Sequence, residues 1–176
     1  MKNVFVGGSR NLSRLSKEVK RRLDNIVEQR LVVLIGDANG ADKAIQQYFA
    51  ERGYRNVVVY CMKGRCRNNV GDWDIHEVAA DSKKRGWEYF ALKDAAMVQD
   101  ASYGFMIWDG ESRGTVNNLL NLVEDGKAAV VYLSPEKKFY TIRTSQDLRE
   151  LVSKCDPMIR EKLRTQLRLD ERLATA

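Results

Sequence analysis

One stretch of the chain carries residues whose types and order could bind an anion, and it runs from Trp108 to Asn118. The apolar, aromatic-rich run before it, at residues 103–107, predicts a buried strand. Apolar residues at helical spacing begin at Val116, so residues 109–115 are expected to form a strand-to-helix turn. Backbone amides that open a helix lack partners and lie at its positive end, where they can hold a phosphate. A turn capped by Ser112 or Thr115, without a ligand, is the alternative.

Two other predicted strands also end in glycine-bearing turns that lead into helices. Residues 3–6 are followed by the turn 7–10, and the continuous apolar run 31–35 is followed by the turn 36–42. An open parallel sheet brings such turns to one edge, outside the carboxyl ends of its strands, where ligands bind near the switch in strand order. The convergence of three turns therefore favours a ligand site over three unrelated chain reversals.

The alternation of strands and helices predicts an α/β, Rossmann-like fold with a predominantly parallel five-stranded sheet and helices on both faces. Parallel strands are expected at residues 3–6, 31–35, 56–61, 103–107 and 127–133, and residues 138–142 could add a short edge strand. Amphipathic helices are expected at residues 13–29, from Ala41 to Gly53, and at residues 88–101, where Phe90, Met97 and Ala101 should point towards the core.

The segment 63–87 is the least regular part of the chain, and we expect a long loop with at most a short helix. It is rich in arginine, asparagine and glycine. Long loops in compact domains are often functional, and the sequence leaves the role of this one open.

The C-terminal part, residues 143–176, is expected to be a helical extension of a domain that spans residues 1–142. It carries an apolar stripe with arginines beside it: Ile159, Leu163 and Leu167, flanked by Arg160, Arg164 and Arg168. The stripe is expected to cover the domain or a second copy of the chain. An arginine face for an anionic partner is the alternative.

Composition limits the class of protein. The chain has 176 residues, of which 44% are hydrophobic, so a single domain with a substantial core is expected. No apolar run approaches about 20 residues, which argues against a membrane partner, and the first strand leaves no room for a signal peptide. We therefore expect a cytoplasmic protein. The net charge of +6 could steer nucleotides or nucleic acid, although scattered basic residues are typical of an ordinary surface.

The cysteines suggest neither a disulfide scaffold nor a metal centre. Cys61, Cys66 and Cys155 are an odd number, so reduced thiols are expected. The spacing of Cys61 and Cys66, with His76 as the one histidine, falls short of the four ligands of a structural zinc site. We predict no metal and no cofactor.

The three turns resemble the signature turns of the SLOG superfamily. The resemblance is carried by Gly7-Gly-Ser-Arg10, Gly36-Asp-Ala-Asn-Gly-Ala-Asp42 and Asp109-Gly-Glu-Ser-Arg-Gly-Thr115, and it covers about residues 1–142. This Rossmann-like group includes the lonely-guy phosphoribohydrolases and the DprA-like proteins, and the chain is most similar to its small, stand-alone bacterial members. The resemblance implies a nucleotide-like ligand, which members bind as a signal or cleave at an N-glycosidic bond. It also suggests a homo-oligomer.

The chain departs from the cleaving members at two positions. Their catalytic arginine corresponds to Lys93, and the glutamate that ends their third turn corresponds to Asn118. Asparagine can bond a ribose hydroxyl but carries no charge or transferable proton, and lysine lacks the forked geometry that suits phosphate. Cleavage of a glycosidic bond needs a carboxylate and an acid.

The sequence therefore predicts a module that binds a nucleotide or a nucleotide-derived ligand as a sensor or nucleotide-handling domain. The predicted ligand-binding residues are Gly7, Gly8, Ser9, Arg10, Gly36, Asp37, Gly40, Ala41, Asp42, Gly110, Ser112, Arg113, Gly114 and Thr115. The alternative is a nucleotide N-glycosidase that releases free base, with Lys93, Asn118, Glu111 and Asp109 as its catalytic candidates. DprA-like nucleic-acid binding is a second alternative.

Overall fold

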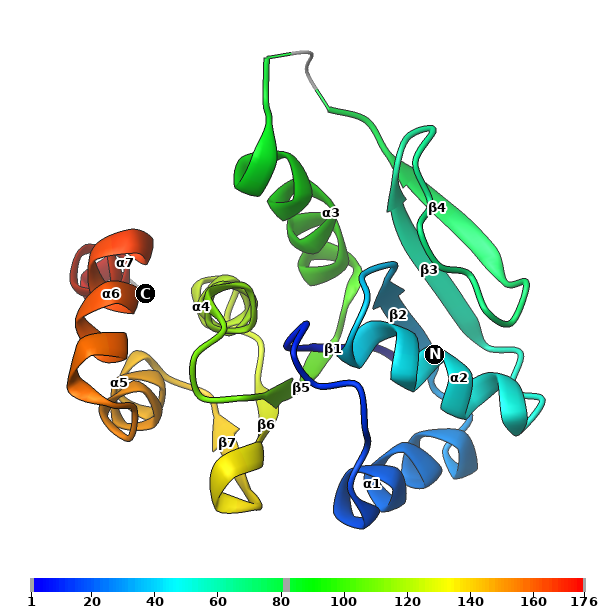
Figure 1. Cartoon of the computed structure of the whole chain (residues 1–176), viewed down its shortest axis with the longest axis horizontal. Coiled ribbons are helices and arrows are strands. Elements are labelled where there is room, and N and C mark those ends of the chain that lie inside the picture. Colours follow the sequence, from blue (N-terminus) through cyan, green and yellow to red (C-terminus); the bar gives the residue numbers. More distant parts are fainter. Residues whose placement is uncertain (1, 81–82, 176) are drawn as a thin grey trace.

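The predicted strands assemble into one sheet, and a computed structural model describes the chain at residues 2–80 and 83–175 (Figure 1). Within these residues the sheet has seven strands in the order β4-β3-β2-β1-β5-β6-β7, all parallel except β7, which runs antiparallel to β6. The strands are β1 (Asn3–Gly8), β2 (Val32–Gly36), β3 (Val57–Met62), β4 (Asp74–Val78), β5 (Tyr103–Trp108), β6 (Ala129–Leu133) and β7 (Lys138–Ile142).

Helices cover both faces of this sheet, as expected (Figure 1). They are α1 (Lys17–Glu28), α2 (Ala41–Glu51), α3 (Gly86–Asp100), α4 (Arg113–Glu124), α5 (Ser145–Ser153), α6 (Pro157–Leu167) and α7 (Leu169–Thr175), with a 3-10 turn, η1, at Ser134–Glu136. Alternate residues of each strand face opposite sides. Val4 and Val6 therefore share a core with α1 and α2, whereas Phe5 between them shares the core of α3 to α7.

The prediction of five strands was wrong, because the sheet has an additional strand at each edge within the described residues. The strand β7 is the edge strand that residues 138–142 were expected to allow. The strand β4 lies in the segment expected to be a loop, and residues 81 and 82 of that segment lie outside the described residues. Asp74 to Glu77 are exposed, so β4 has no apolar alternation to reveal it, as is common in charged edge strands.

The tail helices α5 to α7 pack against α4 and contribute to its core. The side chain of Leu163 is only 1% exposed, and Leu167 is buried beside it. Arg172 of α7 also donates to Glu124 at 2.5 Å and to Asn117 at 3.0 Å, both on α4. The apolar stripe therefore covers the chain's own domain, and these two leucines are not available to cover a second copy.

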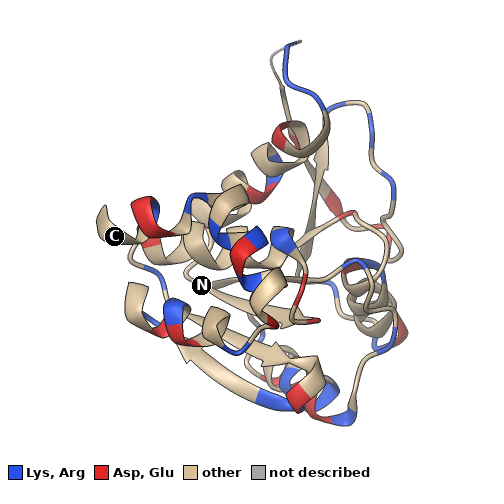
Figure 2. Cartoon of the chain, turned by 60° about the vertical axis from the view of Figure 1, so that its left-hand side comes forward, with Lys and Arg blue, Asp and Glu red and all other residues tan. Residues whose placement is uncertain are grey.

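The tail arginines are largely engaged within the tail itself. Arg164 pairs with Asp170 at 2.6 Å and with Glu161 at 3.3 Å, and Arg168 pairs with Glu171 at 2.5 Å. In Figure 2, basic and acidic residues are interspersed along the helices. The expected alternative of an arginine face is weakened by these pairs. None of the helices in the described ranges combines the length and apolarity needed to cross a bilayer.

Candidate functional site

A cavity lies at the switch point of the strand order, where the chain stops adding strands on one side of β1 and begins on the other. The strand β1 has β2 on one side and β5 on the other, because the first half of the chain extends the sheet from β1 to β4 and the second half extends it from β5 to β7. Such a switch leaves a crevice beyond the carboxyl ends of the strands. A cavity of about 580 Å³ opens there, between the three predicted turns and α3. Its volume lies within the range of roughly 300–1,000 Å³ that small-molecule sites occupy.

Residues from all three turns line this cavity, together with Lys93 and Asn118. The predicted residues that line it are Gly7, Gly8, Arg10, Asp42, Lys93, Ser112, Arg113, Gly114, Thr115 and Asn118. Ser9, Gly36, Asp37, Gly40, Ala41, Asp109, Gly110 and Glu111 do not line it. The structure therefore brings together the backbone of the first turn, one carboxylate of the second and the start of α4.

Asp109 and Ser9 shape the third turn and do not face the cavity. The backbone amides of Glu111 and Ser112 donate to Asp109 Oδ1 at 2.9 and 2.8 Å, and the Asp109 amide donates to Ser9 Oγ at 3.0 Å. The side chain of Glu111 is exposed and borders a smaller cavity beside α6. Neither Asp109 nor Glu111 is thus positioned as a carboxylate of the larger cavity.

Two glycines let the turns approach one another. Gly40 has φ +83°, and a Cβ atom there would collide with the carbonyl oxygen of Arg10. A Cβ atom on Gly8 would collide with the carbonyl oxygen of Ile107. The positive φ of Gly40 and the close contacts at both positions require glycine, so these two residues let the turns pack against one another.

A cluster of buried charges forms one wall of the cavity. Lys93 Nζ lies 2.8 Å from Asp94 Oδ1 and 4.0 Å from Asp37 Oδ1. Gly36 makes room for it, since a Cβ atom there would lie 2.6 Å from Asp42 Oδ2 and 3.0 Å from Lys93 Nζ. The ammonium of Lys93 is therefore surrounded by carboxylates of its own chain.

Burial and neighbouring charge set the protonation of this cluster. Burial raises the pKa of Asp42 to about 6, although the charge of Lys93 acts in the opposite direction. For Asp37 burial would also raise the pKa, but hydrogen bonds from Arg67 outweigh it and the pKa is lowered. Burial would lower the pKa of Lys93, but the charges of Asp94 and Asp42 outweigh it and raise the pKa. The cavity thus contains a carboxyl group whose pKa is raised to about 6 beside an amine whose pKa is also raised.

Two aromatic residues of α3, Trp87 and Phe90, also line the cavity, which their sequence pattern did not predict. The Arg113 guanidinium lies 4.0 Å from the centroid of the Trp87 ring. The Phe90 ring has the guanidinium of Arg67 at 4.6 Å and that of Arg10 at 5.7 Å. Phe90 was expected in the core but is only half-buried, at the cavity wall. The irregular, arginine-rich segment 63–87 was the one signal of this wall.

Hydrogen-bonding groups without a partner lie in the first two turns of α4. Ser112 stands at the N-cap but makes no side-chain capping bond, so the first amides of α4 remain available. Asn118, only 8% exposed, lies one turn further along the helix. Among the described residues, its Oδ1 is the one buried side-chain polar atom without a hydrogen-bond partner. Buried acceptors are normally satisfied, and no donor within the described residues satisfies this one.

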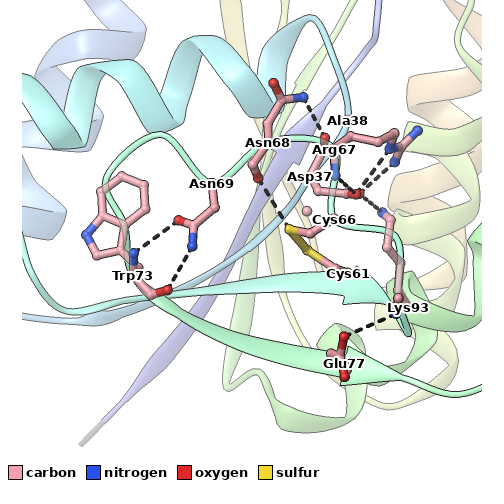
Figure 3. Close-up of a disulfide and its surroundings, with 12 residues drawn as sticks. Asp37, Ala38, Cys61, Cys66, Arg67, Asn68, Asn69, Trp73, Glu77 and Lys93 are labelled. Carbon is pink, nitrogen blue, oxygen red and sulfur yellow. Dashed lines mark hydrogen bonds and ion pairs between the residues drawn. A yellow bond between two sulfur atoms is a disulfide. The ribbon is translucent and has the colours of Figure 1, made fainter.

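The expectation of three reduced thiols was wrong, because Cys61 and Cys66 form a disulfide (Figure 3). A turn after β3 folds Cys66 back onto the strand end and brings the two Cα atoms to 5.0 Å. The spacing alone does not reveal this fold. Asp37 lies close to both sulfur atoms, but sulfurs joined to one another are not thiolate ligands for a metal. Cys155 is free.

A comparison of the chain with protein-family models found no match, and neither did a search of curated proteins.

Proposed function

We propose that the chain binds a nucleoside phosphate in this cavity, as a SLOG-like sensor or nucleotide-handling module. The observation that carries the proposal is the unpartnered, buried Oδ1 of Asn118 in the same cavity as the uncapped start of α4. A phosphate would accept hydrogen bonds from the amides that open α4. A sugar hydroxyl would then donate to Asn118, one helical turn away.

The charges and rings around the cavity support the same class of ligand. Arg113 and Arg10 stand at the cavity with no salt bridge assigned to either among the described residues, whereas Lys93 is compensated by Asp94. We therefore assign phosphate neutralisation to the two arginines, and to Lys93 the role of holding the carboxylates in place. Trp87 and Phe90 offer ring surface on which a base can stack.

A second candidate function is hydrolysis of the N-glycosidic bond of the bound nucleotide. Asp42 favours it, because this carboxyl group lines the cavity and its pKa of about 6 suits an acid or a base near neutral pH. Asn118 and Lys93, in place of the family's glutamate and arginine, favour binding without cleavage. The tests below separate the two.

The binding proposal is tested by calorimetry with nucleoside monophosphates on the wild type and on Asn118→Leu. Leucine has a similar size but no acceptor, so affinity should fall about tenfold, or 1.4 kcal/mol. The matched control is Gln99→Leu, which makes a similar change on the exposed surface of α3 away from the cavity. If Asn118→Leu binds as tightly as the wild type, the amide does not contact the ligand and the proposal fails.

The hydrolysis candidate is tested by chromatography of free base over time. A pure binder leaves nucleoside monophosphates intact over hours, while the variant Asn118→Glu with Lys93→Arg restores the family's charged pair and should release base slowly. Release of base by the wild type, abolished in Asp42→Asn, would instead establish the hydrolase and overturn binding as the sole function.

A further inference from the structure

The disulfide joins Cys61, near the end of the buried strand β3, to Cys66 on the exposed turn that follows it (Figure 3). Cys61 is fully buried, whereas Cys66 is exposed. The loop that the disulfide closes is short, with a sequence separation of 5. Because the stabilisation of the folded state grows with loop length, the effect of this disulfide is expected to be mainly local.

The local segment it anchors is docked by hydrogen bonds. Arg67, next to Cys66, donates to the Asp37 carboxylate through its backbone amide at 3.0 Å, through Nε at 3.1 Å and through Nη2 at 2.6 Å. Asn68 Nδ2 donates to the Asp37 carbonyl oxygen at 2.7 Å. Further along, the amide of Val70 donates to the buried Gln46 Oε1 at 2.9 Å. We refer to residues 63–70 as the docked loop.

The docked loop contacts the wall of the cavity through Arg67. Its guanidinium lies 4.6 Å from the centroid of Phe90, and its partner Asp37 lies 4.0 Å from Lys93 Nζ. Phe90 and Lys93 both line the cavity. A change in the position of Arg67 would therefore alter an aromatic wall and would leave Asp37 as a buried carboxylate with Lys93 as its remaining cation.

We propose that Cys61 and Cys66 form a reversible redox site that controls the docked loop and, through Arg67, the affinity of the cavity for its ligand. The oxidised form holds Arg67 on Asp37 and beside Phe90, and the reduced form releases it. The proposed control of the loop is supported by the contacts of residues 63–70 themselves and does not depend on the proposed function. The effect on ligand affinity rests on the proposed nucleotide binding.

The chemistry is thiol–disulfide exchange with a low-molecular-weight thiol. The thiolate attacks the sulfur of Cys66, the exposed residue of the pair, the bond between the two cysteines breaks, and Cys61 leaves as a thiolate that takes up a proton. A second thiolate attacks the mixed disulfide, releasing Cys66 and an external disulfide. Two electrons pass from the two external thiols to the pair, and both protein sulfurs end as thiols.

The experiment compares amide hydrogen exchange in the oxidised wild type, the wild type reduced with dithiothreitol, and Cys66→Ser. Alkylation and mass spectrometry establish the oxidation state of each sample. The amides of Arg67 and Val70 should exchange at least tenfold faster in the reduced wild type and in Cys66→Ser than in the oxidised protein. The matched control is Cys155→Ser, which removes the free cysteine and should keep the full redox response.

Calorimetry with a nucleoside monophosphate on the same samples tests the link to the cavity. Reduction and Cys66→Ser should each weaken binding about tenfold, and Arg67→Gln should bind weakly in both oxidation states. Exchange rates that do not differ between the oxidised and reduced wild type overturn the redox site. A redox-dependent exchange rate without nucleotide binding in either state upholds control of the loop but refutes the proposed function.

Discussion

Gly114 is the position at which a single added side chain should separate ligand binding from folding. It stands in the first turn of α4 and lines the cavity. A Cβ atom there would lie 3.7 Å from the Trp87 ring, which is ordinary van der Waals contact, and its φ is not positive. Gly114→Ala is therefore expected to fold, with a stability equal to the wild type or higher by up to about 1 kcal/mol.

The ligand should respond in the opposite direction. The added methyl group occupies the space through which a phosphate would approach the first amides of α4. Hydrogen bonds to a charged group are worth about 1.5–3 kcal/mol, so losing one should reduce affinity roughly tenfold to a hundredfold. Gly114→Val, with a bulkier side chain, should bind more weakly than Gly114→Ala.

The assay is calorimetry with a nucleoside monophosphate, together with thermal unfolding of each free protein. Ala95→Val is the matched control, since Ala95 is exposed on α3 and does not line the cavity. Wild-type affinity in both Gly114 variants would refute the placement of the phosphate at α4. A large loss of stability in Gly114→Ala would show that the glycine is structural.

Three further predictions concern stability, each measured by urea unfolding. Gly40→Ala should lose about 3 kcal/mol or more, because a side chain there meets the carbonyl oxygen of Arg10 at positive φ; wild-type stability would contradict this. Leu163→Ala should lose about 2–5 kcal/mol if α6 is part of the core, whereas a change below about 0.5 kcal/mol would mean that the tail detaches freely. The raised pKa of Asp42 means that the folded state binds its proton more tightly than the unfolded state, so stability should fall as pH rises from about 4 to 6, by about 3 kcal/mol for this group. Asp42→Asn should lack that fall, and parallel pH profiles of the two proteins would refute the assignment.

Several strands and turns could be predicted from the sequence because they depend on local residue patterns. The runs at β1, β2 and β5 are continuous and apolar because parallel strands are covered on both faces, and each is followed by glycine and polar residues that can form a turn. Parallel pairing then brings those turns to one edge without further information. The convergence of residues such as Gly7, Asp42 and Gly114 on one cavity was predictable for that reason.

The direction in which each side chain points was decided by tertiary structure. Asp42 and Asp109 both follow strands, yet only Asp42 lines the cavity, because the Asp109 carboxylate is occupied by the amides of its own turn. Phe90 has the spacing of a core residue but lines the cavity and contacts three arginines, Arg10, Arg65 and Arg67, which come from turns remote in sequence.

Contacts that depend on how the chain folds back on itself could not be predicted from sequence patterns either. The strand β4 gains its place from pairing with β3 and not from apolar residues, so its exposed side chains give no periodic signal. The pairing of Cys61 with Cys66 depends on a turn that folds the chain back onto β3, and the hold of Arg67 on Asp37 joins positions 30 residues apart. Composition and spacing therefore predict the elements that bury an apolar face, whereas the folding of loops onto their neighbours decides where β4 forms and which charges and sulfur atoms meet.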